Sequence, residues 1–287
     1  NVLSINPFNI EKTEIILGAG SVIYGSDAIG GVMNFYTKTP EISKSGAIQF
    51  STKSVLRHAT ANNEKTVQLS INVGKKKWAS HTGLSFSDFG DLKMGQIDNE
   101  AYSTPFYVAQ ANGQDILMPN HDPKIQKFTG FNQFHGVQKF FYKTDESLKF
   151  DFGLHYSTTS NIPRYDRLII QNPNNSLKYS EWNYGPQKWI LANSQATKLS
   201  NHSKFYDKIK ASMAYQNFQE SRIIRGFQST VRNIRSENVD AFSFNFDLDK
   251  SVSEKTSLSY GTEYIYNKIR SRGVSMDTQT NNQESIP

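Results

Sequence analysis

The sequence predicts a mainly β protein, and three observations predict it. Asn, Ser and Thr are abundant, and Phe (19) and Tyr (14) greatly outnumber Met (5) and Trp (3), which favours strands and polar loops over helices. Several segments alternate apolar and polar residues with a period of two. Short and long connections alternate between these segments. The 287 residues contain no run of 18 apolar residues, which excludes a transmembrane helix but leaves a transmembrane β-barrel open.

Nine segments are expected to form the strands. In residues 148–156 every even position is apolar and every odd position is polar or Gly. Residues 67–73 and 242–248 alternate in the same way. The other six expected strands are residues 48–56, 78–86, 134–142, 187–195, 205–215 and 258–266. Two of these, 134–142 and 187–195, depart from strict alternation.

The connections divide into two kinds, as an antiparallel transmembrane β-barrel requires. Residues 74–77, 144–147, 199–204 and 251–254 are expected as short periplasmic turns, and residues 59–65, 87–130, 159–186 and 219–232 as outer loops, the first of them short. A soluble β-sandwich or propeller is the alternative, because such folds also have alternating strands. The two differ in where the apolar face points: a sandwich buries it, whereas a barrel wall exposes it to lipid around a wet lumen.

The first 40 residues differ from the rest. An apolar run at residues 10–17 is followed by Gly18-Ala19-Gly20 and then by a second apolar segment at residues 32–36, which predicts strand, glycine turn and strand. A dinucleotide-binding turn would need a third small residue where Ile23 stands and an acidic residue about twenty positions further on. Both features are missing from the sequence, so we reject nucleotide binding.

Residues 13–40 resemble the end of the plug domain of TonB-dependent outer-membrane receptors. The family pattern S-x-YGS-x-AIGGVINIITK is matched nearly position for position by Tyr24, Gly25, Ser26, Asp27, Ala28, Ile29, Gly30 and Gly31. Gly18-Ala19-Gly20 departs from the usual Lys-Gly-Pro, and Lys12-Thr13 stands where Arg is frequent. The resemblance implies that residues 1–40 are the C-terminal part of a plug domain and residues 41–287 the first part of a 22-stranded barrel. We therefore expect the remaining strands beyond Pro287 and the rest of the plug before Asn1.

The same resemblance implies active import across the bacterial outer membrane. The expected cargo is a scarce ligand, an iron carrier or haem, and the expected partners are outer-membrane lipid, lipopolysaccharide and the TonB energy-coupling complex, which would act on residues upstream of Asn1. A binding or adhesion receptor for a host protein or glycan, with or without a lipoprotein lid, is the alternative. The plug motif disfavours a passive porin. The residues do not identify the ligand.

All nine Arg residues fall at predicted outer ends or in outer loops: Arg57, Arg164, Arg167, Arg222, Arg225, Arg232, Arg235, Arg270 and Arg272. Lys residues show no such bias. Because Arg suits bidentate recognition of phosphate and carboxylate, we hypothesise that Arg222, Arg225, Arg232 and Arg235 contact lipopolysaccharide phosphates or an anionic ligand. Loop salt bridges and solubility are the alternative roles for these four residues.

Two outer segments, 160–167 and 181–187, are rich in aromatic and Arg residues. They are similar to segments of receptors from Bacteroidetes-type bacteria, including haem and iron-carrier proteins. Arg164, Tyr165, Arg167, Trp182 and Tyr184 are therefore candidate ligand contacts at the mouth. An aromatic girdle at the membrane boundary is the alternative, and we favour it for Trp189.

Composition argues against several other functions. The absence of Cys excludes disulfides and thiolate metal sites, and the six His residues show no metal-ligand spacing. His121, followed by Asp122, is retained only as a candidate metal or haem ligand. No catalytic motif is present, so the sequence predicts no enzyme, no resident cofactor and no metal site. The formal net charge of +6 is spread along the chain, which gives no reason to expect a nucleic-acid partner.

Overall fold

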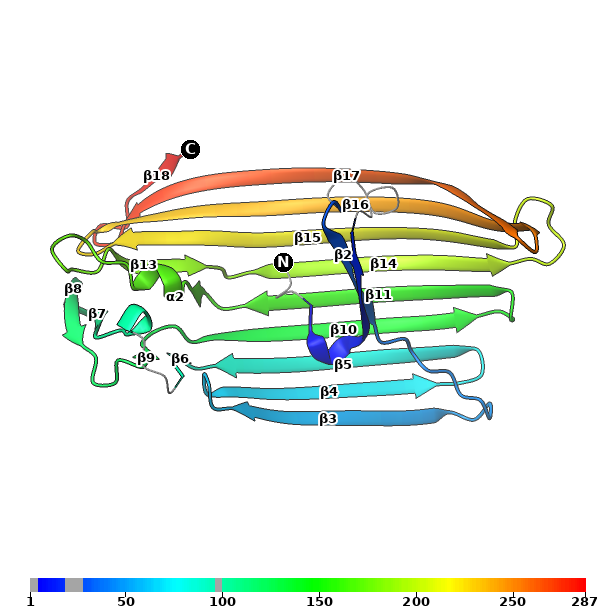
Figure 1. Ribbon diagram of the computed structural model, residues 1–287, viewed down its shortest axis with the longest axis horizontal. Coiled ribbons are helices and arrows are strands. Elements are labelled where there is room, and N and C mark those ends of the chain that lie inside the picture. The colour runs from blue at the N-terminus through cyan, green and yellow to red at the C-terminus, as the bar shows by residue number, and fades with distance from the viewer. Residues whose placement is uncertain (1–4, 19–27, 96–99) are drawn as a thin grey trace.

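The computed structural model describes residues 5–18, 28–95 and 100–287, which are dominated by one 12-stranded antiparallel sheet (Figure 1). All nine predicted strands are present in it. Its main path runs from β18 back to β3 in the order β18-β17-β16-β15-β14-β11-β10-β5-β4-β3. The bounds are β3 (Gln49–Ala59), β4 (Glu64–Gly74), β5 (Trp78–Phe89), β10 (Phe131–Lys143), β11 (Leu148–Thr159), β14 (Lys188–Leu199), β15 (Lys208–Gly226), β16 (Val231–Ser253), β17 (Thr256–Asp277) and β18 (Gln283–Ile286).

The long connections gather at one end of the sheet and the short turns at the other (Figure 1). One predicted loop is wrong. Residues 219–232 are largely strand, because β15 and β16 stay paired from Lys208↔Asp249 as far as Arg225↔Arg232. The apolar alternation fades in this region, since the strands continue beyond the part that faces lipid, and the sequence pattern therefore suggested a loop.

The sheet exposes its apolar face and buries its polar face. Along β4, Val67 and Leu69 are 55% and 39% exposed, whereas the alternating Gln68 and Ser70 are 1% and 5% exposed. The buried set across β4, β5, β10 and β11 is mostly polar: Thr66, Gln68, Ser70, Asn72, His81, Ser85, Ser87, Gln133, His135, Ser157 and Thr159. A soluble sandwich has the opposite arrangement, so that alternative is wrong.

An N-terminal segment covers part of the polar face. It consists of the 3-10 turn η2 (Pro7–Asn9) and the antiparallel hairpin of β1 (Ile10–Leu17) and β2 (Gly31–Thr37), which crosses in front of the sheet in Figure 1. Lys139 of β10 donates to the Thr37 hydroxyl (3.0 Å) and to the Lys38 carbonyl (2.9 Å). Asn6 donates to Ser85 over 2.8 Å. Polar contacts therefore join this segment to the wall.

Close approach requires glycine at one wall position beneath this segment. A Cβ on Gly83 of β5 would clash with Asn9 Oδ1 and lie 2.8 Å from Val137 Cγ1. The predicted strand, turn and strand of the N-terminal region is confirmed for β1 and β2. Of the motif residues, Ala28 is buried and Ile29 is 75% exposed. Gly30 and Gly31 follow them into β2, whereas Tyr24, Gly25, Ser26 and Asp27 lie outside the described residues.

The outer connections carry structure of their own that the sequence pattern did not predict. Their elements are β6 (Leu92–Lys93), η3 (Glu100–Tyr102), β7 (Phe106–Ala111), β8 (Gln114–Pro119), β9 (Ile125–Gln126), β12 (Ile162–Pro163), α2 (Tyr165–Leu168) and β13 (Tyr179–Tyr184). Asn112 and Gly113, with φ of 51° and 76°, make the tight turn between β7 and β8. Within the described part of the chain, no helix has the length and apolar character needed to cross a membrane.

Candidate functional site

The candidate site forms where β13 adds to the outer half of β15. The register pairs Tyr184 with Arg222 and Glu181 with Arg225. Because strand side chains alternate, Trp182, Tyr184 and Arg222 share one face, and Glu181 and Arg225 share the other. The face with Arg222 continues the polar, lumen-facing side of β15, opposite the exposed Met213 and Tyr215. The aromatic pair therefore lies at the mouth of the lumen.

Three guanidinium groups surround these two rings. Trp182 and Tyr184 meet edge to face with centroids 5.1 Å apart. Arg164 lies 5.4 Å from the Trp182 ring and 5.2 Å from Tyr184. Arg222 lies 5.9 Å and 5.5 Å from the same rings, and Arg167 lies 6.0 Å from Trp182. These distances are those of cation–π contacts, so the rings hold the arginines in place.

Positive charge exceeds negative charge in this group, which we name the mouth cluster (Arg164, Arg167, Trp182, Tyr184 and Arg222). Asp166 accepts from Arg164 through both carboxylate oxygens, each at 2.7 Å, and lies 3.7 Å from Arg167. This hydrogen bonding raises the pKa of Arg164 and lowers that of Asp166. Arg222 has no carboxylate partner among the described residues and stands directly opposite Arg235. The surface suits an anionic ligand with flat groups that can stack.

The mouth cluster contains four of the five ligand contacts predicted from the sequence. The fifth, Tyr165, is 54% exposed; its backbone carbonyl accepts from Gln126. His121 is exposed in the long connection and makes no polar contact with the cluster in the described part of the chain. No group of three His, Cys, Asp or Glu residues in that part could hold a metal. Arg222 joins the cluster through a strand pairing that sequence periodicity does not reveal.

Trp189 does not belong to a lipid-facing girdle, so that prediction is wrong. Its ring packs 6.1 Å from His155, and its indole nitrogen donates to Gln216. Together with Asn6 and Phe35, Trp189 lines a cavity of about 320 Å³ between the wall and the N-terminal segment. The break in alternation around residue 189 hid the fact that this side chain points to the polar face.

A buried salt-bridge network lies on the other face of β13 and β15. Arg225 is 4% exposed and donates twice to Asp115 and once to Glu181, each over 2.8 Å. Asp115 also accepts from the Gln228 backbone (2.8 Å) and from the Ser180 hydroxyl. Burial opposes ionisation of Asp115, but the hydrogen bonds from Arg225 and Ser180 outweigh it and lower its pKa to about 2. The network ties the β7–β8 hairpin to β13 and β15.

Two of the four arginines expected to bind anions take part in this network. Arg232 donates to both oxygens of Glu181, over 2.8 Å and 2.6 Å. The geometry of Arg225 and Arg232 therefore favours the loop salt-bridge alternative, whereas Arg222 and Arg235 are exposed. Asp115, the hub of the network, was not singled out from the sequence. The Asn112-Gly113 turn signals its hairpin, but nothing in the sequence signals its partner.

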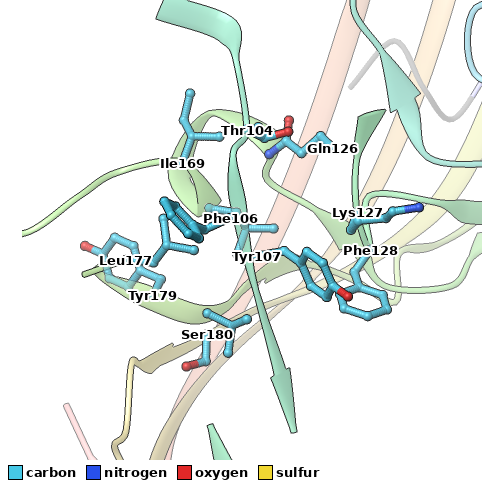
Figure 2. Close-up of a pocket in the computed structure, with 12 residues that line it drawn as sticks. Thr104, Phe106, Tyr107, Gln126, Lys127, Phe128, Ile169, Leu177, Tyr179 and Ser180 are labelled. Atoms are coloured by element: carbon cyan, nitrogen blue, oxygen red, sulfur yellow. The ribbon is translucent and has the colours of Figure 1, made fainter. Parts of the chain in front are cut away.

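A small apolar cavity beside this network is a packing seam. Figure 2 shows Phe106 of β7 beside Leu177 and Tyr179, and Tyr107 on the other side of the strand beside Phe128, whose ring centroid lies 5.6 Å away. Its volume of about 50 Å³ holds a few water molecules at most, far less than a haem or an iron carrier needs. The packing of the side chains around this cavity, together with the salt bridges, holds the β7–β8 hairpin against the segments that carry the mouth cluster.

Comparisons with known proteins agree with this architecture. No family model matches the chain. The solved copper transporter OprC superposes with a TM-score of 0.71 over 99% of this chain and 38% of its own, at 14% identity. The ferric yersiniabactin uptake receptor FyuA from Yersinia pestis gives 0.57 over 97% and 47%, at 11% identity, and the ferric citrate transporter FecA gives 0.57 over 98% and 37%, at 14% identity.

The chain has the fold of the TonB-dependent outer-membrane receptors. A curated relative, the iron-regulated outer membrane virulence protein of Vibrio cholerae, is 51% identical over 43 residues, which are 15% of this chain and 7% of that protein. The predicted family resemblance and the bacterial outer-membrane location are confirmed. The chain spans less than half the length of each of these proteins. The 22 strands of a complete barrel and the boundary between residues 1–40 and 41–287 stay predictions.

Proposed function

We propose that the chain is part of a TonB-dependent importer that carries an iron carrier or haem across the bacterial outer membrane. The observation that carries this proposal is the inverted wall, with an apolar outer face and a polar inner face on which the N-terminal hairpin is seated. A lipid-exposed cylinder with an obstructed, wet lumen needs this arrangement. The solved proteins of the same fold are described as transporters or receptors of copper, ferric yersiniabactin and ferric citrate.

The contacts between the wall and the N-terminal segment suit a part that moves. Lys139 donates to Thr37 and Lys38, and Asn6 donates to Ser85, in a polar lumen. Water can replace each of them, so the net cost of separation is about 1 kcal/mol per bond. In this proposal ligand binding at the mouth biases the plug toward opening, and the TonB complex supplies work from the proton gradient.

The mouth cluster is the proposed ligand-capture surface. Its arginines attract an anionic carrier or the carboxylates of haem, and the half-buried Tyr184 offers a ring on which conjugated groups stack, whereas Trp182 is buried and supports the guanidinium groups. Each cation–π or charged hydrogen-bond contact contributes about 1–2 kcal/mol, so losing two of them should weaken capture by at least about tenfold.

The test expresses the full-length protein in a deletion strain. The strain is supplied with haem or a ferric siderophore as its sole iron source, or with a glycan as its sole carbon source. R164Q/R167Q/R222Q should weaken binding of the supported ligand at least about tenfold, because two or more charged contacts are lost. K75Q/K76Q/K77Q, an equal charge change in the short turn between β4 and β5, should leave it unchanged. Growth on none of the iron sources contradicts the proposal, and binding without TonB-dependent uptake would instead indicate an adhesion receptor.

A further inference from the structure

The lipid-facing side of β14–β17 changes from apolar to basic over a few cross-strand rows. One row consists of Ala192, Tyr215, Phe242 and Tyr266, and the row below it of Ser194, Met213, Phe244 and Tyr264. Of these side chains, Met213, Tyr215, Phe242, Tyr264 and Tyr266 are exposed large apolar groups. The next row outward is Ile190, Asn217, Asp240 and Lys268, so the apolar band ends between Tyr266 and Lys268. This break marks the outer boundary of the hydrocarbon region.

Two further rows on the same face carry the positive charge. Lys188, Gln219, Asn238 and Arg270 form the first, and Ser221, Ser236 and Arg272 form the second. Successive rows are about 7 Å apart, because each covers two residues of strand. Lys188, Arg270 and Arg272 therefore lie in the layer just outside the hydrocarbon, where lipid headgroups reside.

These side chains surround a depression of about 320 Å³, which we name the headgroup pocket (Lys188, Ser221, Ser236, Arg270 and Arg272). The hydroxyls of Ser221 and Ser236 lie 3.0 Å apart on adjacent strands. Glu220 and Glu237 also line the depression, but their side chains alternate to the lumen side of their strands, where Gln187 donates to Glu220. Asp240, one row closer to the membrane, forms an ion pair with Arg270 and accepts from Tyr215 and Asn217, both over 2.7 Å. One carboxylate thus faces four cations: Lys188, Lys268, Arg270 and Arg272.

We propose that the headgroup pocket binds the phosphate of a phosphorylated glycolipid of the outer leaflet, with the acyl chains lying along the tyrosine-rich rows beneath. Arg270 and Arg272 offer fork-shaped donors for phosphate oxygens, Lys188 adds a third cation, and the serines donate hydroxyl hydrogen bonds. A membrane lipid fits because the pocket is continuous with the lipid-facing band and not with the lumen. The assignment moves lipid contact away from Arg225 and Arg232, which face carboxylates. It rests on the proposed barrel but not on any ligand that the barrel imports.

The test measures binding of diphosphorylated lipid A to the full-length protein in detergent by native mass spectrometry. K188Q/R270Q/R272Q should lower the affinity at least about tenfold, because three charged contacts to phosphate are lost. K75Q/K76Q/K77Q is the matched control with the same charge change at the opposite end of the wall. Resistance of the folded barrel to unfolding in cold detergent, read on a gel, confirms that each variant is intact.

Two further probes identify what the pocket recognises. Dephosphorylated lipid A should bind wild type and triple variant equally weakly, and inorganic phosphate alone should not compete with lipid A. If the triple variant and the control lose equal affinity for lipid A, the effect comes from net charge and not from the pocket, and the proposal is overturned. Equal binding of phosphorylated and dephosphorylated lipid A would also overturn it, as would saturable competition by inorganic phosphate. A failure of import with these results unchanged would refute the proposed function and leave the pocket standing.

Discussion

Replacing Asp115 with Asn tests whether the buried salt bridge holds the longest outer connection in place. Asp115 and Arg225 have side chains that are 2% and 5% exposed, so the change leaves a buried guanidinium without its main counter-ion. The depressed pKa gives a lower estimate of the loss: a fall from 3.8 to about 2 corresponds to about 2 kcal/mol. Breaking one side of a buried pair costs about 3–5 kcal/mol, which gives the upper estimate.

Hydrogen exchange measures this loss of stability at the β7–β8 hairpin itself. A loss of about 2–5 kcal/mol in the opening free energy should speed exchange of the β7–β8 amides by about thirty- to several-thousand-fold, measured by mass spectrometry on the full-length protein in lipid nanodiscs. D122N is the matched control in the same connection, because Asp122 is exposed and, among the described residues, its carboxylate accepts only a local hydrogen bond from the Lys124 backbone. Its peptides should exchange as in wild type.

The same carboxylate predicts a pH dependence with a definite sign. Because its folded-state pKa lies below the ordinary value, its stabilisation is complete above about pH 4 and is lost as the pH falls toward 2. Wild-type protection of the hairpin should therefore decline only in that range, after correction for intrinsic exchange. Exchange of D115N within about threefold of wild type at neutral pH would refute the reasoning, since the network would then contribute less than about 1 kcal/mol.

The remaining predictions concern the two faces of the wall. L154R places a cation at the middle of the lipid-facing side of β11 and should destabilise the barrel by about 2–4 kcal/mol in vesicle unfolding by guanidinium. Q195R, on the polar face opposite Asp151, should cost less than about 1 kcal/mol, and equal losses would contradict the face assignment. G83A should loosen the segment around Asn9, seen as faster proteolysis of the N-terminal region, because its Cβ has no room there. G136A, whose Cβ would meet its neighbours at 3.6 Å or more, should not; identical digestion of the two variants would argue against close packing of the segment on the wall.

The sequence predicts the wall well because lipid imposes a regular pattern on it. Residues 148–156 show apolar alternation without exception, and β11 (Leu148–Thr159) contains them all. The sequence also predicts the family motif and the two strands on either side of the glycine turn. Beyond the lipid the constraint ends, so β15–β17 continue for several residues that carry no periodic signal, and 219–232 was predicted as a loop.

The mouth depends on pairings between segments distant in the chain. Arg222 meets Trp182 because β13 adds to β15, and Asp115 meets Arg225 across 110 positions. Composition signalled the aromatic and Arg-rich segments 160–167 and 181–187, which is why four of the cluster residues were predicted. It did not indicate which arginines would be neutralised, because burial and counter-ions are properties of the folded chain.

Fluorescence quenching by brominated lipid tests the central claim most directly, because residues 1–287 contain no Cys and accept single labels. Met213 and Ser212 are neighbours on β15 that point to opposite faces. In vesicles of brominated lipid, a fluorophore on M213C should be strongly quenched, and one on S212C should be quenched instead by a water-soluble reagent. Equal quenching of both labels by the lipid, or the reverse pattern, would contradict a wall with its apolar side toward the membrane and its polar side toward the lumen.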